Sequence, residues 1–135
     1  MVQNFEERPS LVLQKAEDFA VRMVNLWKHM AFKMQEHDMS RQAKRSGTSV
    51  GANIAEALSA ASKRDFLNKI YIAFKECSET KYWLRIMQKT EYLSQSEFDS
   101  IYGDACEIER MLTTIIRTTK INLSRESLTE ASPDF

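Results

Sequence analysis

The most constraining feature of this sequence is a run of small side chains inside a helical pattern. Residues 46–62 read SGTSVGANIAEALSAAS, and eleven of them are Gly, Ala or Ser. The only two prolines, Pro9 and Pro133, lie far from this segment. A helix of such residues fills little volume by itself, so other helices must pack against it at close range, on one side or on several. The segment therefore predicts a tight helical bundle that is also oligomeric.

Gly47 and Gly51 lie four residues apart on one face of this expected helix. A glycine inside a helix costs roughly 1 kcal/mol relative to alanine. That cost is tolerable where the missing side chain lets another backbone approach, so we interpret both glycines as a contact surface. A phosphate-binding glycine loop is the alternative, but the chain contains neither GxxxxGK[ST] nor GxGxxG.

Three further residues of the segment are assigned to the same close-packing or oligomer surface: Asn53, Ala55 and Glu56. An unpaired buried polar group costs roughly 1 to 3 kcal/mol, so a buried Asn53 or Glu56 needs a hydrogen-bond partner. Arg45 and Tyr82 are candidates for that role. The alternative interpretation is that these polar residues line a ligand pocket.

Apolar residues recur at three- and four-residue spacing in four stretches of the chain, which is typical of amphipathic helices. The predicted helices span residues 10–34, 40–60, 63–91 and 94–123. Ser10, Ser62 and Ser94 are the expected N-caps, the last two with an acidic residue three positions later.

Short connections between long helices imply antiparallel neighbours. We therefore predict an all-α fold, an antiparallel up-down-up-down four-helix bundle over residues 10–124. Residues 1–9 are expected to form a flexible N-terminus and residues 125–135 a flexible C-terminal tail.

The bulk composition fits one globular domain. The chain has 135 residues, of which 43% are hydrophobic and 28% charged, and its formal net charge is zero. A domain that coats nucleic acid usually has a basic surplus, so this balance argues against strong nonspecific binding but leaves a local basic patch open.

The compartment is predicted from the thiols and the absence of apolar runs. Cys77 and Cys106 share no short spacing, and we expect buried thiols in a reducing space, with a disulfide or a metal role as alternatives. No stretch resembles a secretory signal or approaches the ~20 apolar residues that span a bilayer. The expected location is the cytoplasm.

The acidic pair Glu76 and Glu79 has the one carboxylate spacing that could face a metal ion. Such a site needs a second acidic pair on a facing helix, and Glu107 and Glu109, two residues apart, fit poorly. The alternative is pairing with nearby cations, for example Lys75 with Glu79. We predict no catalytic residue, no metal and no cofactor.

Basic residues gather at two predicted helix starts. Arg41, Lys44 and Arg45 begin the second helix, and Lys63 with Arg64 begins the third. These five are the candidate phosphate contacts of a nucleic-acid-binding surface, and an ordinary solvated face is the alternative.

The stretch from Arg45 to Leu84 carries a long ordered motif. Its residues are Arg45, Ser46, Ser49, Val50, Asn53, Ile54, Ala55, Glu56, Ser62, Asp65, Phe66, Ile72, Ala73, Glu76, Glu79, Thr80, Tyr82, Trp83 and Leu84. This motif resembles that of the four-helix bundle proteins encoded in intervening sequences of bacterial 23S rRNA genes, which are loosely labelled ribosomal proteins.

The resemblance implies an antiparallel bundle that assembles as a ring, most often a homopentamer, without an established enzymatic activity. That family is also similar to the accessory protein of diversity-generating retroelements, a basic pentamer that binds nucleic acid, whereas this chain is neutral. Our leading hypothesis is a non-enzymatic oligomer that contacts RNA or DNA. A scaffold for a protein partner and a metal-dependent enzyme built on Glu76 and Glu79 are the alternatives.

Overall fold

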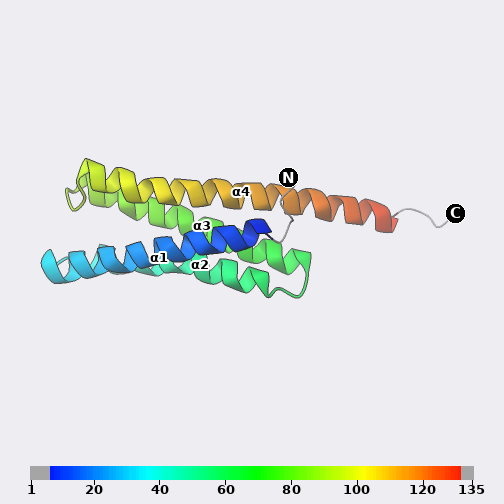
Figure 1. Cartoon of the computed structure of the whole chain (residues 1–135), viewed down its shortest axis with the longest axis horizontal. Coiled ribbons are helices and arrows are strands. Elements are labelled where there is room, and N and C mark those ends of the chain that lie inside the picture. The colour runs from blue at the N-terminus through cyan, green and yellow to red at the C-terminus, as the bar shows by residue number, and fades with distance from the viewer. Residues whose placement is uncertain (1–6, 132–135) are drawn as a thin grey trace.

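The fold is an antiparallel bundle of four helices. A computed structural model describes residues 7–131, in which the helices are α1 (Glu7–Lys33), α2 (Asp38–Leu58), α3 (Lys63–Lys89) and α4 (Gln95–Ala131). Successive helices run in opposite directions (Figure 1), and residues 7–131 contain no strand. The predicted all-α, up-down-up-down four-helix bundle is confirmed.

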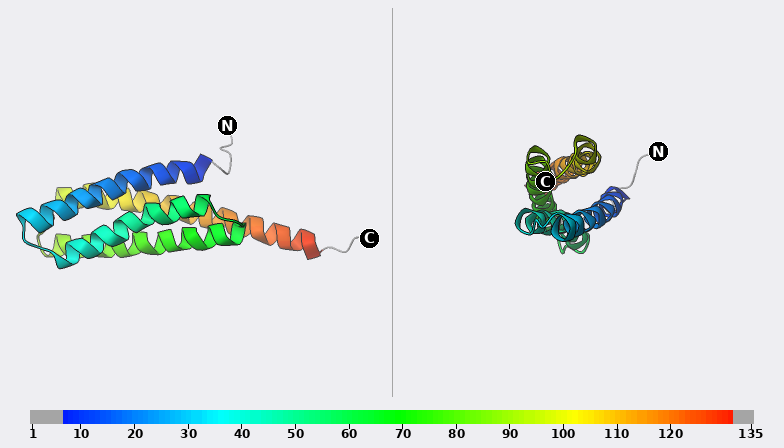
Figure 2. Two further views of the ribbon diagram at one scale, coloured as in Figure 1. Left: turned by 90° about the horizontal axis from the view of Figure 1, so that it is seen from below. Right: turned by 90° about the vertical axis from the view of Figure 1, so that its left-hand side faces the viewer.

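The four helices are not packed with equal closeness. Each helix packs against its neighbours in the chain, most extensively α2 against α3, and the α1–α4 pair makes the sparsest contact. Seen along the bundle, α1 and α4 are accordingly the most widely separated neighbours (Figure 2). The bundle therefore has one open seam, between its first and last helices.

The core follows the periodic apolar stripes. Its largest fully buried side chains come from all four helices: Phe19, Met23, Met30, Ile54, Ile70, Leu84, Met87, Ile108 and Leu112. Within the described residues, every buried side-chain nitrogen or oxygen has a hydrogen-bond partner. None of the described helices contains an apolar stretch that could cross a membrane.

Two of the three predicted N-caps are confirmed. The Ser62 hydroxyl accepts a 3.1 Å hydrogen bond from the N–H of Asp65. At the start of α4, the Ser94 hydroxyl accepts from the N–H of Glu97 at 3.2 Å, and the Glu97 carboxylate accepts from the N–H of Ser94 at 2.8 Å. This reciprocal pair is a capping box.

The predicted starts of the first two helices are wrong. Helix α1 begins at Glu7, ahead of Ser10, because Pro9 is tolerated in a first turn whose N–H groups have no helical partner. Helix α2 begins at Asp38, and the Glu36 carboxylate receives three backbone N–H groups, those of Asp38 (3.2 Å), Met39 (2.8 Å) and Ser40 (2.7 Å).

Helices α1 and α4 extend into the predicted flexible ends. Residues 7–9 belong to α1, and residues 125–131 belong to α4, which extends past the ends of the other helices (Figure 1). Adding residues to an existing helix is easier than starting one, and Glu126 pairs with Lys63 of α3. Residues 1–6 and 132–135, the remainder of both predicted flexible ends, lie outside the described residues.

Candidate nucleic-acid interface

The five predicted phosphate contacts do not form one patch. Arg41, Lys44 and Arg45 lie near the start of α2, whereas Lys63 and Arg64 lie at the start of α3, at the opposite end of the bundle (Figure 2). Helix α2 has 21 residues and is therefore about 30 Å long. A single short ligand could contact the cations of α2 or those of α3, but not both groups at once.

Arg45 is engaged by the acidic pair of α3. Its Nη1 lies 3.3 Å from Oε2 of Glu76, and its Nη2 forms an ion pair with Glu79. Trp83 adds a hydrogen bond from its Nε1 to Glu79 at 3.3 Å. Arg45 thus joins α2 to α3. The cation that pairs with Glu79 is Arg45 and not Lys75.

The same ion pairs bear on the metal alternative. Both Glu76 and Glu79 already bind a guanidinium that a metal ion would have to displace. No group of three or more His, Cys, Asp and Glu side chains suited to a metal ion occurs within residues 7–131. Glu109, which fitted poorly as part of a second metal-binding pair, forms a 3.0 Å ion pair with Lys81.

At the far end, Lys63 is paired with Glu126 of α4. Its neighbour Arg64 is exposed and forms no ion pair with another described residue. The Lys63 partner was missed because residues 125–131 were expected to be a tail.

The start of α2 has a basic and aromatic surface that it shares with α1. The Nζ of Lys44 lies 3.6 Å from the centroid of the Trp27 ring, a cation–π contact. Trp27 meets Phe32 edge to face at a centroid distance of 5.7 Å and an interplanar angle of 65°. Phe32 is 66% exposed, and Arg41 lies 3.6 Å from Asp38, with both side chains largely in solvent.

We call the group of Trp27, Lys28, Phe32, Arg41 and Lys44 the basic–aromatic surface. Sequence reasoning found Arg41 and Lys44 but missed the three residues of α1. The available signal was the four-residue spacing of Lys28 and Phe32, which places both on one side of the helix. Their closeness to α2 depends on how the two helices are aligned.

The two glycines of α2 are contacts within the chain. A Cβ atom on Gly47 would lie 2.6 Å from Cγ of Met23, and one on Gly51 would lie 3.5 Å from Cβ of Ala16. Both glycines are buried against α1. The predicted close packing at Gly47 and Gly51 is therefore present between α2 and α1.

The other predicted packing residues lie toward the outside of α2. The side-chain amide of Asn53 donates to the carbonyl of Ser49 at 2.8 Å, and Glu56 forms a 2.8 Å ion pair with Lys69. Glu56 and Ala55 are exposed, and Asn53 is half-buried. The proposed partners Arg45 and Tyr82 are wrong for both polar residues, because Arg45 turns to the acidic pair of α3.

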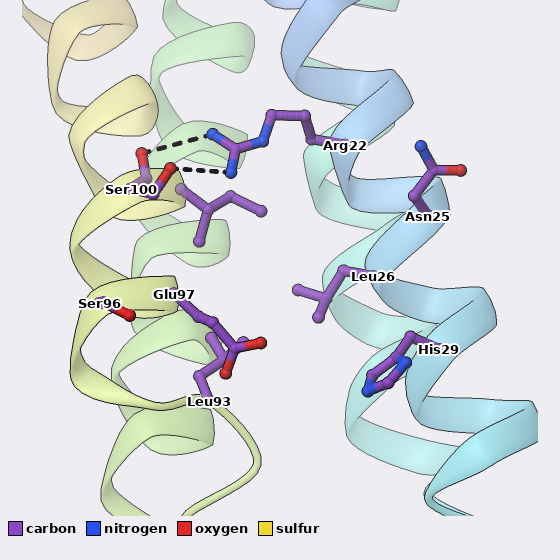
Figure 3. Close-up of a pocket in the computed structure, with 9 residues that line it drawn as sticks. Arg22, Asn25, Leu26, His29, Leu93, Ser96, Glu97 and Ser100 are labelled. Carbon is purple, nitrogen blue, oxygen red and sulfur yellow. Dashed lines mark hydrogen bonds between the residues drawn. The ribbon is translucent and has the colours of Figure 1, made fainter.

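The α1–α4 seam contains a cavity of about 530 Å³. Arg22 crosses the seam to Asp104 (2.6 Å) and to the hydroxyl of Ser100 (3.0 Å). Below it, His29 and Glu97 point into the cavity from opposite walls (Figure 3). Hydrogen bonds with Ser94 lower the pKa of Glu97, and the electrostatic effect of nearby His29 lowers it further. The cavity is lined by both polar and apolar side chains and is open to solvent.

The cysteines differ in burial. Cys77 is fully buried, and its Sγ–H donates to the carbonyl of Ala105 at 3.4 Å. Burial raises the pKa of the Cys77 thiol to about 12. Cys106 is half-buried, and both cysteines are free. The predicted buried thiol is confirmed at Cys77 only, and the structure gives no disulfide between the two.

Together these features define a class of protein, an all-α antiparallel four-helix bundle whose helices are joined by ion pairs of their carboxylates. The chain belongs to the 23S rRNA-intervening sequence protein family, whose family model matches residues 8–114. It is also similar to a crystal structure of a protein of unknown function from the S23 ribosomal protein family of Bacteroides thetaiotaomicron. The identity is 46%, the match covers 82% of this chain and 98% of that one, and the TM-score is 0.80. Among curated proteins, none matches this chain.

Proposed function

We propose that this protein is a non-enzymatic bundle that acts in the cytoplasm as an oligomer, a pentameric ring, and binds nucleic acid. The observation that carries the nucleic-acid part is the basic–aromatic surface, where Lys28, Arg41 and Lys44 lie on two adjacent helices. Phosphate contacts supply most of the affinity of nucleic-acid-binding proteins. A ring repeats the surface in every subunit, and this avidity offsets a neutral monomer.

The oligomer is supported by exposed apolar and small side chains on α2 and α3. Ile72 and Tyr82 of α3 are 39% and 48% exposed, and Ala55 of α2 is exposed as well. Apolar and small side chains on an outer face suit contact with another subunit. These three residues also belong to the motif that carries the family resemblance.

A non-enzymatic role is supported by what the reactive groups already do. Glu76 and Glu79 are paired with Arg45. The raised pKa of Cys77 keeps that thiol protonated, and the thiolate is the nucleophilic form.

Nucleic-acid binding is tested by titrating labelled RNA and duplex DNA at several salt concentrations. If Arg41 and Lys44 each contact one phosphate, the Arg41→Ala/Lys44→Ala variant weakens binding and lowers the salt slope by about two per engaged subunit. Arg64→Ala, which removes an exposed cation at the far end, is the matched control. A loss half as large in this control, which removes one charge instead of two, would assign binding to net charge and not to this surface.

The oligomer is tested by light scattering on the purified protein. The expected mass is about five times the 15.7 kDa of the chain. A mass equal to one chain at micromolar concentration would contradict this part of the proposal, without bearing on whether the surface binds nucleic acid.

A scaffold for a protein partner is the second candidate function. The observation that favours it is the α1–α4 seam, whose cavity is lined in part by Leu26, Leu93 and Ile101, apolar side chains suited to contact with another protein's side chains. A partner that co-purifies after nuclease treatment, and is lost when Leu26 is replaced by Glu, would support the scaffold.

A further inference from the structure

Phe32 exposes most of an aromatic ring at the end of α1. Its side chain is 66% exposed, although a ring of this size usually contributes to a core. Trp27 supports it edge to face, and Trp27 is itself covered by the ammonium of Lys44. The ring thus contacts Trp27 and leaves most of its surface open to solvent.

Each of the two helices also supplies cations near this end of α1. Lys28 precedes Phe32 by four residues and lies on the same side of α1. The Lys44–Trp27 contact fixes the alignment of the two antiparallel helices. Because α2 runs opposite to α1, Arg41, about one turn before Lys44, lies level with the last turn of α1, where Phe32 is found.

The carboxylates nearby do not cancel this charge. Asp38 is the exposed one, 3.6 Å from Arg41. Glu36 is occupied by the backbone N–H groups that begin α2. Three cations against one exposed carboxylate leave the basic–aromatic surface positive.

We propose that the basic–aromatic surface binds single-stranded nucleic acid, with a base stacked on Phe32 and phosphates on Lys28, Arg41 and Lys44. This inference rests on the proposed function and adds to it the state of the strand and the residue that recognises it. In a duplex the base faces are stacked on one another, so a duplex can use the cations but not the ring. A single strand offers both phosphates and free base faces, which aromatic side chains bind without regard to sequence.

The test compares three fluorescein-labelled ligands of equal length: an oligo-dT, an oligo-U and a mixed-sequence duplex. We expect the intact protein to bind both single strands more tightly than the duplex at equal salt. Phe32→Ala should weaken single-strand binding about tenfold or more. Duplex binding and the salt slope should not change, because the variant removes no charge.

Val21→Ala is the matched control. Val21 lies three turns before Phe32 on the same side of α1 and is 61% exposed. Its replacement removes exposed apolar surface from the same face while leaving the cations and the aromatic pair in place. We expect it to bind all three ligands like the intact protein.

Tryptophan emission gives a second measurement. The chain has two tryptophans, so Trp83→Phe leaves Trp27, the ring in contact with Phe32, as the reporter. Oligo-dT should change this emission, and the change should disappear when Phe32→Ala is added.

The outcomes separate this inference from the proposed function. Salt-dependent binding that favours the duplex, or that Phe32→Ala leaves intact, would overturn the inference and keep nucleic-acid binding. No binding of any ligand at low salt would overturn both. A changed assembly mass in Phe32→Ala, with no selective loss of single-strand binding, would assign the ring to a subunit contact and overturn the inference.

Discussion

The hydroxyl of Thr80 on α3 lies 2.8 Å from the hydroxyl of Ser46 on α2 and donates a hydrogen bond to it, and both side chains are fully buried. Ser46 donates in turn to the carbonyl of Ala43 at 3.2 Å. Because both side chains are short, the two helices lie close together at a point where a larger residue would hold them apart. Helix α2 therefore packs tightly on two sides, against α1 through glycine and against α3 through serine.

Removing either hydroxyl of this pair should cost stability. We expect Ser46→Ala and Thr80→Val each to lower the free energy of unfolding by about 1 kcal/mol. The double variant should lose less than the sum, because the bond between the two hydroxyls is removed only once. Denaturant unfolding of the four proteins in the cycle measures the coupling, and strict additivity would show that the bond contributes nothing.

Alanine at the glycines of α2 should have opposite effects. At Gly47 the new Cβ would lie 2.6 Å from Cγ and 3.1 Å from Cβ of Met23, which cannot swing away, so strain of about 1 to 3 kcal/mol should exceed the gain in helix propensity. At Gly51 the nearest atoms lie at an ordinary 3.5 Å, so alanine should be neutral or stabilising by up to about 1 kcal/mol.

Gly103→Ala is the control for helix propensity alone, because nothing lies within 4 Å of the position of its Cβ. It should stabilise the protein by up to about 1 kcal/mol. Thermal unfolding of the three variants ranks them. If Gly47→Ala proved as stable as Gly103→Ala, the close approach of α2 to Met23 would not be a constraint.

The two thiols should differ in reactivity. Burial raises the pKa of Cys77 to about 12, so this thiol should resist a disulfide reagent at mildly alkaline pH, while half-buried Cys106 reacts more readily. The variants Cys106→Ser and Cys77→Ala isolate each thiol. A rapid reaction of native Cys106→Ser protein, at a rate unaffected by stabilising conditions, would contradict the burial of Cys77.

The raised pKa of Cys77 also predicts a loss of folding stability at high pH. A thiol whose pKa is raised by folding stabilises the native state below its ordinary value of 9.0, and that contribution falls as the pH rises toward about 12. Comparing the unfolding free energies of the intact protein and Cys77→Ala across this interval measures it. Equal slopes would show that Cys77 does not contribute.

The cap of α2 should make stability sensitive to acid. Partial burial opposes ionisation of Glu36, but the N–H groups of Ser40, Met39 and Asp38 outweigh it and lower its pKa. Because the folded pKa is depressed, this stabilisation is present above the ordinary value of 4.5 and is lost as the pH falls through the folded pKa.

We therefore expect Glu36→Gln to lower the unfolding free energy by about 1 kcal/mol near neutral pH, the usual value of a helix cap. The difference from the intact protein should shrink in acid as Glu36 itself becomes protonated. Ser62→Ala, which removes a cap that does not titrate, should show a difference that stays constant over the same interval.

Much of the bundle was predictable because its signals are local. The apolar spacing of Phe19 and Met23 or of Ile108 and Leu112 is fixed by the period of a helix, and the capping box at Ser94 needs only a residue three positions away. The cap formed by Glu36 was missed because Glu36 lies outside α2. It precedes the N-cap residue His37, whose own side chain makes no capping hydrogen bond.

The candidate site was less predictable because its residues come from different helices. Arg41 and Lys44 were found from their clustering in the sequence, but nothing in that clustering separates them from Arg45. That distinction arises because Glu76 and Glu79 face Arg45 from α3, and such pairings depend on the rotation and alignment of two helices.

The sequence by itself determined that this chain forms four helices, where the last two begin, and which sides they bury, since each of these depends on residues a few positions apart. Only the tertiary structure decided which charges are paired, that the glycines of α2 pack against α1, and that Lys44 of α2 lies on the Trp27 ring, which contacts Phe32. The physical reason is that helix formation is governed by local spacing, whereas contacts between helices depend on how their side chains interlock over the whole length of the bundle.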